Sequence, residues 1–513
     1  MASNAGLGPA TTPGTRSLWS KLGWSVATQI VVRFTTFGQG VVMAHLLFPK
    51  DFGKYAVALS AVAVLLAIND AGIINGIIRW PGALDEVTST AATVVLAVSV
   101  LAFMVAEVFA PQFSTAVGVP SAASVVRLVS LVVVIDALCA VPSALMFRQF
   151  RVRARLVAEV TGLFANTVVA VGLALTHHGV FSIAWGRIAG AAVTAGLVIA
   201  MSEHRPRPGF DRKIARSLLT FGVPLSAAAL LEGVLLNTDY VVIGRHFRDP
   251  AMLGAYVLAF NFASWPVNML TQSVNRISIP AFASLQDKRV ELQRALSRAL
   301  ALMVVPAGIS AVVLSLLARP AVRVVYGAKW AHAIGPLRVL AFVGAIRVII
   351  NLSQDALVAL GHSRDALRLK VIWFVVLVPL LIIGVKIDSL RGVGLAHLAV
   401  AGLIVLPITL RLLVVRAGVD LMDVARQATR PILAGVVSWV ISAALLVRTE
   451  WGPTWSLVSV MFLTLVTYAV IVGPQFRSLL GRSAMPAVAV DEPPYAGPVA
   501  DDALDATPLT DRG

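Results

Sequence analysis

Long apolar stretches recur along this chain from about residue 24 to residue 473, and they constrain its fold more than any other feature. Each approaches the roughly 20 residues that an α-helix needs to cross a bilayer. The chain is 58% hydrophobic and 13% charged, with a mean hydropathy of +0.85. Soluble globular chains carry about 25% charged residues, and membrane β-barrels show short alternating segments instead. The sequence therefore predicts an all-α, polytopic membrane protein.

The distribution of charge predicts the topology. We count about fourteen transmembrane helices, and an even number places both termini on one side of the membrane. With the termini inside, the cytoplasmic segments hold 26 of the 42 Lys and Arg residues, and the external loops hold 10. This asymmetry follows the positive-inside rule. We therefore expect both termini in the cytoplasm, with basic loops that contact anionic membrane lipids.

Several functional classes are disfavoured. The net charge of +16 comes from short loops and not from a basic soluble domain, so we expect no nucleic-acid binding. The single cysteine, Cys139, lies in an apolar segment, and no Cys/His cluster has the spacing of a zinc site. We expect neither a metal nor a cofactor. The loops are too short to hold a catalytic domain with paired acids or a His, which argues against a membrane enzyme such as a glycosyltransferase or ligase.

An internal repeat indicates two halves. Residues 45–58 match residues 246–259 after a shift of 201 positions, and the His, Pro, Gly, Tyr and final Ala are identical. Six spans separate the copies, so both halves point the same way through the membrane, which is a transporter architecture. We expect a disordered tail over residues 1–16, an N-lobe over 17–203, a C-lobe over 204–416, two additional helices over 417–482 and a disordered acidic tail over 483–513.

A polar face runs along the eighth span, which is otherwise apolar. Its members recur at helical steps of three and four residues: Asn261, Trp265, Asn268, Gln272 and Asn275, with Arg276 at the end. Such a face borders water or a polar ligand; alternatively, the amides hydrogen-bond neighbouring helices. The amides would suit the hydroxyl groups of a sugar.

Two further arginines lie on polar faces of other spans. Arg33 is in the first span, and Arg347 shares a face with Asn351 in the tenth. Together with Arg276 they would give a cationic lining between the two lobes. The planar guanidinium keeps its charge and can donate two parallel hydrogen bonds to a phosphate. The competing interpretation pairs each Arg with an acid across helices.

Acidic residues inside spans are candidates for ion coupling. These are Asp70, Glu232, Asp239 and Asp355. Glu232 and Asp239 are seven residues apart and share a helix face, so they could bind a proton or Na⁺ and couple its gradient to transport. They could equally pair with Arg276.

Several short motifs resemble those of bacterial polysaccharide flippases. These proteins are the O-antigen and exopolysaccharide branch of the multidrug/oligosaccharidyl-lipid/polysaccharide transporter superfamily, and the resemblance covers about residues 17–480. The motifs are Asn237-Thr238-Asp239 with Gly244, the turn Gly254–Ala259, Ile279–Phe282, and Tyr326-Gly327-Ala328-Lys329-Trp330 followed by Ala333, Pro336, Leu337 and Leu340.

The resemblance implies a V-shaped pair of six-helix lobes with two extra helices in the bacterial cytoplasmic membrane. It implies movement of an undecaprenyl-diphosphate-linked oligosaccharide to the outer leaflet, through a cationic central cavity. A polysaccharide polymerase and glycosyltransferases are candidate partners. Two alternatives stay open. One is a cation-coupled multidrug exporter of the same superfamily, with Asp70 and Asp136 as candidate acids, although Arg33 in the first span would repel a cationic drug. The other is a lipid II flippase. Lipid II flippases have an arginine-rich first span, whereas here only Arg33 lies deep in that span.

Overall fold

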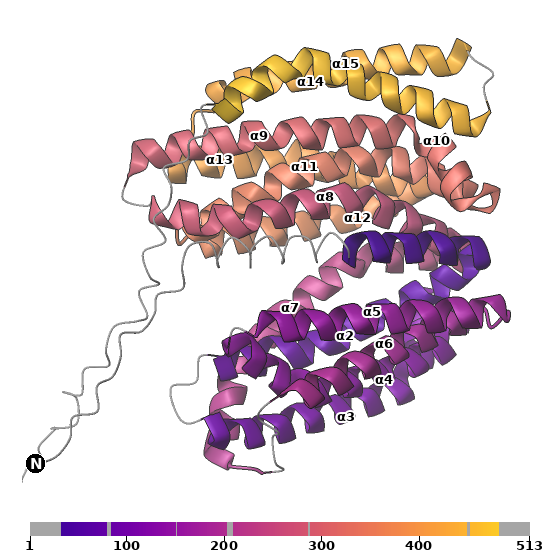
Figure 1. Ribbon diagram of the computed structural model, residues 1–513, viewed down its shortest axis with the longest axis vertical. Helices are drawn as coiled ribbons and strands as arrows, with labels where there is room; N and C mark the ends of the chain where they lie inside the picture. Colours follow the sequence, from indigo (N-terminus) through magenta and orange to yellow (C-terminus); the bar gives the residue numbers. More distant parts are fainter. Residues whose placement is uncertain are drawn as a thin grey trace, which may run out of the picture.

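The computed structural model describes the backbone of residues 32–78, 84–149, 151–202, 209–285, 288–448 and 452–481, and most side chains within these ranges. The regular elements in these ranges are helices (Figure 1). Nine helical segments of the described chain are long and apolar enough to cross a membrane. The prediction of an all-helical membrane protein is therefore confirmed, whereas the count of about fourteen spans stays a prediction.

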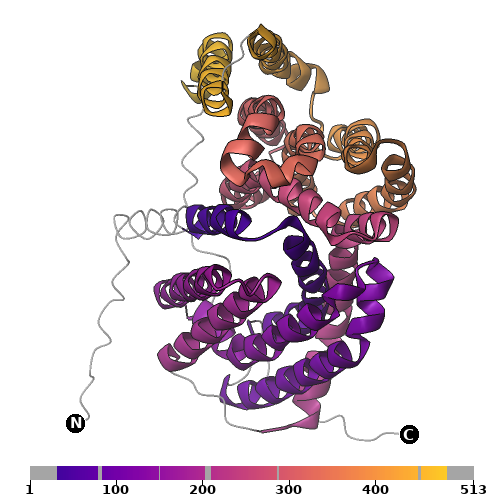
Figure 2. The same cartoon turned by 90° about the vertical axis from the view of Figure 1, so that its right-hand side faces the viewer.

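The first part of the chain forms one group of helices (Figures 1 and 2). Residues 32–46 are helical and are called the N-terminal helix below. The group continues with α2 (Pro49–Ile78), α3 (Leu84–Val117), η1 (Pro120–Ala122), α4 (Ala123–Arg148), α5 (Val152–Leu175) and α6 (Val180–Met201). The long α7 (Arg212–Phe247) packs against α2 and α3 of this group and also contacts α12. The expected lobe boundaries stay a prediction.

The second group begins with α8 (Figure 1). It contains α8 (Pro250–Ser284), α9 (Arg289–Leu316), α10 (Ala318–Ala321), η2 (Val322–Tyr326), η3 (Ala328–Ala333), α11 (Ile334–Ala359), α12 (Ser363–Ala399), η4 (Val400–Val405) and α13 (Leu406–Ala417). The last two described helices, α14 (Leu421–Arg448) and α15 (Pro453–Gly481), lie on the outer side of this group and pack against α9.

The helix α12 is a hairpin. Asp388 and Ser389 leave the helical conformation, with φ values of −139° and +49°. On either side of them, Gly384 and Gly392 approach so closely that a Cβ on either would collide with the carbonyl oxygen of the other. The 55-residue apolar segment Ser363–Ala417 therefore reverses direction at this turn.

Hydroxyl side chains join α14 to α15. Ser442 and Thr464 share a hydrogen bond of 2.9 Å, and Thr467 donates to Ser438 over 2.9 Å. The Tyr468 hydroxyl then donates to the Val305 carbonyl oxygen of α9 at 2.9 Å. Hydroxyl bonds of this kind hold membrane helices together, because packing against lipid offers no hydrophobic gain.

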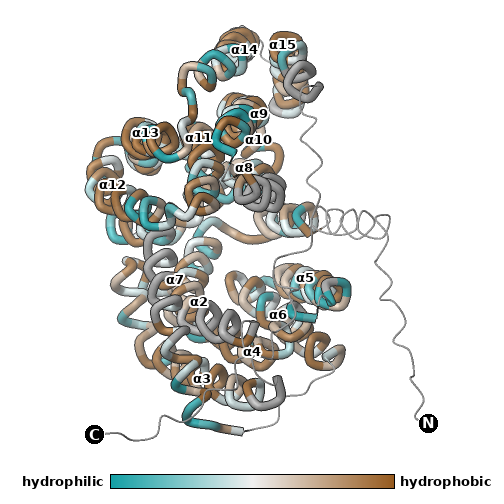
Figure 3. Tube along the Cα trace, turned by 90° about the vertical axis from the view of Figure 1, so that its left-hand side faces the viewer, coloured by the Kyte–Doolittle hydropathy of each residue, from teal (hydrophilic) through white to brown (hydrophobic). Residues whose placement is uncertain are grey.

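Large apolar side chains cover much of the outer surface. Figure 3 shows hydrophobic residues along the helices of both groups. Leu403 on η4 is 78% exposed and Phe462 on α15 is 69% exposed. A surface this apolar would be unstable in water, so these side chains face lipid.

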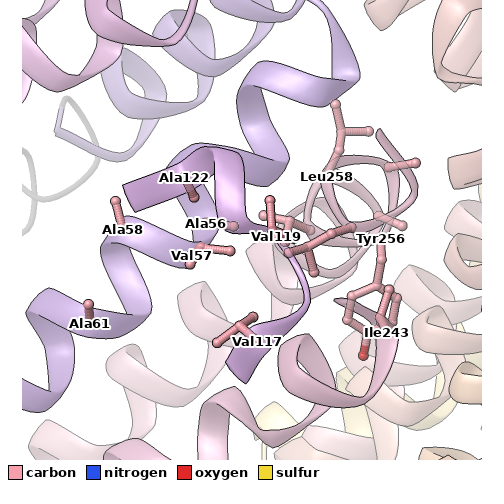
Figure 4. Packing of buried hydrophobic residues seen from close by; sticks show 14 of the residues in the cluster. Ala56, Val57, Ala58, Ala61, Val117, Val119, Ala122, Ile243, Tyr256 and Leu258 are labelled. Carbon is pink, nitrogen blue, oxygen red and sulfur yellow. The ribbon is translucent and has the colours of Figure 1, made fainter. Parts of the chain in front are cut away.

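Small residues build the seam between the two groups. Alanines and valines of α2 and of the α3–α4 connection pack against α7 and α8, as Figure 4 shows. Small side chains let membrane helices approach closely. The labelled small residues are Ala56, Val57, Ala58, Ala61, Val117, Val119 and Ala122, and they pack against the larger Ile243 of α7 and Tyr256 and Leu258 of α8.

Candidate substrate and coupling sites

Two helical hairpins meet at one end of the molecule, called the hairpin end below. One is the N-terminal helix with α2, and the other is α7 with α8. A Cβ added to Gly53 would collide with the carbonyl oxygen of Pro250, and one added to Gly254 would collide with that of Pro49. The partners are related by the 201-residue repeat, so the contact is reciprocal, as in a two-fold interface. Only glycine permits this backbone-to-backbone closure.

A second close contact ties α7 to the first group at the hairpin end. Gly118 follows α3 with a φ of +92° and lies against the backbone of Gly244. The neighbouring Arg245 donates from Nε to the Ala116 carbonyl oxygen at 2.6 Å. Both closures therefore bring the backbones of different helices into direct contact at the hairpin end.

Asp239 lies on α7 near the hairpin end and is only 4% exposed. The Tyr256 hydroxyl of α8 donates to its Oδ2 at 2.7 Å, and the Tyr240 N–H donates to its Oδ1 at 3.0 Å. His397 of α12 places Nε2 3.8 Å from Oδ2. That nitrogen is buried and has no hydrogen-bond partner in the described part of the chain. A buried carboxylate inside a membrane helix, beside a hydroxyl and an imidazole, is a candidate site for ion coupling.

Arg347, in the middle of α11, is half-buried beside this cluster. The Asp239 carboxylate acts on its guanidinium electrostatically. The guanidinium lies 5.8 Å from the centre of the Phe260 ring on α8. Among the described residues, no carboxylate is within ion-pair distance of it. Arg347 can therefore accept a second anion while Asp239 remains its neighbour.

Arg33 lies at a different depth. It is half-buried, one turn before Phe37, whose ring packs on Trp265 of α8 with centroids 4.9 Å apart. Because the N-terminal helix and α8 run antiparallel, Arg33 is at the level of Asn268. Arg347 meets α8 about two turns nearer the hairpin end. The structure thus places the two predicted arginines at different turns of α8 and does not gather them in one compact group.

The predicted amide face follows the seam between α8 and the N-terminal helix. Asn261 and Asn268 are exposed on either side of Trp265, whose indole Nε1 is buried without a partner among the described residues. On α11, Asn351 is half-buried one turn from Arg347. Asp355 follows, half-buried, and the structure describes no partner for its Oδ2.

The other predicted site residues lie outside the described side chains. They are Asp70, Glu232, Gln272, Asn275 and Arg276. The pairing of Glu232 or Asp239 with Arg276, and the lining with three arginines, stay predictions. What the structure adds is a different partner for Asp239, the hydroxyl of Tyr256.

A second polar cluster lies within the first group. Arg187 of α6 acts electrostatically on Asp136 of α4 and on Tyr55 of α2. Its Nε is buried with no partner in the part of the chain that the structure describes. Tyr55 and Tyr256 are the equivalent tyrosines of the repeat, so each half carries a tyrosine beside charged groups.

A basic groove lies at the opposite end of the molecule from the hairpins. Its volume is about 620 Å³, and the described residues that line it are Lys213, Arg216, Ser217 and Thr220 on the first two turns of α7. Each of these four residues is three or four positions from two of the others, so they lie on one face of the helix. Its two basic side chains can attract an anionic head group.

The α7–α8 hairpin, α2 and Asp239 fall within a recognised family pattern, which begins near the end of the N-terminal helix. The model of a family described as "Polysaccharide biosynthesis protein" matches residues 42–335. The chain belongs to this family. The matched region includes Gly53, Gly254 and Tyr256 and ends before Arg347.

Curated relatives carry related names. The chain is 27% identical over 330 residues to the succinoglycan biosynthesis transport protein ExoT of Rhizobium meliloti (strain 1021), covering 64% of this chain and 67% of the relative. It is 24% identical over 396 residues to the lipopolysaccharide biosynthesis protein WzxC of Escherichia coli (strain K12), covering 74% and 77%. One relative named as a transport protein and one named as a lipopolysaccharide biosynthesis protein thus each resemble most of this chain.

Solved structures share the fold. The lipid II flippase MurJ, in an inward closed conformation, superposes with a TM-score of 0.75 over 89% of this chain and 99% of its own, at 14% identity. An inward-facing multidrug resistance MATE family transporter of the MOP superfamily gives a TM-score of 0.60 over 74% and 94%, at 15% identity. At these identities the likeness concerns the fold alone, which is that of membrane transporters.

Sequence reasoning missed both partners of Asp239. Tyr256 carried a signal, because it is one of the identities in the repeat. His397 carried none: it is a lone histidine in an apolar segment, 158 residues from Asp239, and only helix packing brings them together.

Proposed function

We propose that this protein is a flippase that carries a polyprenyl-diphosphate-linked oligosaccharide across the cytoplasmic membrane by alternating access, for surface or exopolysaccharide synthesis. The observation that carries the proposal is the reciprocal closure of Gly53 and Gly254 in a chain of the polysaccharide biosynthesis family. Polar and cationic side chains lie beneath this closure, so a head group could enter from the other end. The polyprenyl tail would remain in the lipid.

The proposed topology has about fourteen spans, with an N-lobe, a C-lobe and two added helices over the residue ranges given above. The hairpin end faces outward and both termini face the cytoplasm of a bacterial cell. Loop charge supports this orientation, and so does the groove at Lys213 and Arg216, which would meet the anionic inner leaflet. Glycosyltransferases and a polymerase would supply and consume the cargo.

The proposed head-group site uses arginines for the diphosphate and amides for the sugars. Arg33 and Arg347 lie at two depths along α8, so the diphosphate would pass from one to the other as the carrier changes state. Arg276 belongs to the same proposed set. The proposed sugar contacts are Asn261, Asn268, Gln272, Asn275 and Asn351.

The proposed coupling ion is a proton at Asp239. Hard metal ions prefer several oxygen ligands, whereas the neighbours of this carboxylate are a phenol that donates a hydrogen bond and an imidazole nitrogen. In the empty carrier, Arg347 balances the charge of Asp239. A diphosphate that binds Arg347 would remove that balance, which would couple cargo binding to the ion at Asp239. Asp70, Glu232 and Asp355 remain candidate coupling residues.

A deletion strain tests the function. Without the protein, we expect lipid-linked oligosaccharide to accumulate in the inner leaflet and surface polymer to be lost, and the wild-type gene to restore both. A multidrug exporter would instead leave the polymer normal and change drug susceptibility. A lipid II flippase would be essential for cell-wall synthesis and would leave the oligosaccharide intermediate at its normal level.

A further inference from the structure

The segment Tyr326–Trp330 reaches across the hairpin end to the N-terminal helix. Lys329 donates from Nζ to the carbonyl oxygens of His45 and Leu47, both at 2.7 Å. These carbonyls belong to the end of the N-terminal helix, where the last four have no partner within a helix. A cation there also opposes the negative end of the helix dipole. Lys329 therefore caps a helix that precedes it by more than 280 residues.

Trp330 reinforces the same contact. Its side chain is fully buried, and the indole Nε1 donates to the Ala44 carbonyl oxygen at 3.0 Å. The ring meets Phe52 of α2 edge-on, with centroids 4.9 Å apart. Lys329 and Trp330 together thus donate to the carbonyl oxygens of residues 44, 45 and 47 at the end of the N-terminal helix. Trp330 also packs against an aromatic ring of the next helix.

The segment is firmly attached to the second group. Tyr326 is buried and its ring packs edge-on against Phe262 of α8, with centroids 5.5 Å apart. Gly327 turns the chain with a φ of +94°, a conformation that side chains rarely adopt, and so points the next residues at the N-terminal helix. Each quoted member of the Tyr-Gly-Ala-Lys-Trp motif except Ala328 has a role in this geometry.

The N-terminal helix, in contrast, is attached at this level to the first group. Met43 and Leu47 are buried in a cluster with Ala170 and Ala174 of α5. One turn earlier, Gln39 donates to Asn166 of α5 at 3.3 Å. The contacts of Lys329 and Trp330 therefore cross from one group of helices to the other.

We infer that Lys329 and Trp330 form a latch that holds the hairpin end closed, and that the carrier opens there by releasing the last carbonyls of the N-terminal helix. The latch binds main-chain oxygens, so its target does not depend on the side chains at 44, 45 and 47. Separation would expose those carbonyls and the ammonium to water together, and hydration of both would allow the latch to break reversibly. This role rests on the proposed alternating access, but it does not depend on the identity of the cargo.

Spin labels measure the latch directly. Cys139 is the only cysteine, so a Cys139→Ala background permits two labels. Thr176→Cys on the α5–α6 connection and Lys386→Cys on α12 are exposed positions near the hairpin end, one in each group. We expect one short distance in the wild type. Lys329→Met with Trp330→Phe should raise the ratio of long to short distances at least about tenfold, because three hydrogen bonds are lost.

Two matched variants separate the latch from general damage. Lys50 and Lys329 both lie over the Phe48 ring, at 5.8 Å and 5.1 Å from its centre. Lys50 donates no described hydrogen bond to the end of the N-terminal helix, so Lys50→Met is the control. It should leave the distances unchanged, and Lys329→Arg should restore the short one. Unchanged distances in the double variant, or an equal shift from Lys50→Met, would overturn the latch. If the double variant does not fold, Trp330→Phe alone carries the test, with a smaller shift expected and no shift counting against the latch.

Discussion

Gly53 and Gly254 each lie against the carbonyl oxygen of a proline in the opposite hairpin, and the four residues form a reciprocal pair. At these glycines the two hairpins meet through their backbones, and no side chain can change rotamer to allow a partial separation. The closure is therefore a two-state contact, either formed or separated. The proposed alternating access requires a two-state element of this kind, and the two copies of the repeat supply one where they meet.

Gly53→Ala or Gly254→Ala should therefore open the hairpin end. The added methyl group cannot fit, and overpacking of this kind costs about 1–3 kcal/mol. The long-distance population of the labelled protein should rise, and the thermal midpoint in detergent should fall. Gly172→Ala is the matched control, since a Cβ there meets no atom within 4 Å. Equal midpoints and distances for Gly53→Ala and Gly172→Ala would refute the closure.

Arg347→Gln should slow transport by about 10- to 100-fold, since a charge-assisted hydrogen bond to phosphate contributes about 1.5–3 kcal/mol. Arg347→Lys should retain part of the rate, because it keeps the charge and loses the fork. Arg338 is an exposed residue of the same helix, so Arg338→Gln is the control and should transport normally. The measurement is the initial rate with a lipid-linked oligosaccharide in proteoliposomes. A normal rate for Arg347→Gln would remove this residue from the site.

Asp239→Asn should uncouple transport from a proton gradient. The imposed gradient would no longer change the initial rate, because the amide cannot exchange a proton in this range. Tyr256→Phe should keep coupling but lower stability by about 1–3 kcal/mol, since the buried carboxylate loses a donor. Asp388→Asn, on the exposed turn of α12, is the control. Coupling that persists in Asp239→Asn would assign the proton to another acid.

Asp365→Ala should destabilise the end opposite the hairpins. This carboxylate is 5% exposed and pairs with Arg416 of α13 at 2.9 Å and with Arg368 at 3.2 Å. Removing one member of a fully buried ion pair lowers the free energy of unfolding by about 3–5 kcal/mol. Because Arg416 is partly exposed, we expect a loss at or below the low end of that range for Asp365→Ala.

The control for that prediction lies on the same helix. Asp388 and Arg391 form an exposed pair at 3.6 Å, and Asp388→Ala should change the free energy of unfolding by less than about 1 kcal/mol. Denaturant unfolding in detergent measures both. Similar losses from Asp365→Ala and Asp388→Ala would show that burial adds nothing to the first pair.

Periodicity and charge were enough to predict the helical membrane fold, because hydrophobic length is a local property of the chain. The repeat also located the hairpins correctly, since Pro49, Gly53 and their counterparts meet in the structure. The partners of Asp239 could not be predicted, because His397 approaches only after α7 and α12 pack. Arg33 and Arg347 lie beside different turns of α8, and these positions depend on how the helices pack against one another. Helical periodicity shows which residues share a face of one helix, but not which turns of two helices are neighbours.

The most direct test of the account is flipping by the purified protein. Proteoliposomes would contain a fluorescent polyprenyl-diphosphate-linked oligosaccharide, and a membrane-impermeant glycosidase would report how much of it reaches the outer leaflet. The account predicts a rate well above that of protein-free liposomes, reduced by Arg347→Gln and unaffected by Arg338→Gln. A rate equal to that of protein-free liposomes, from wild-type protein that is folded and inserted, would contradict it.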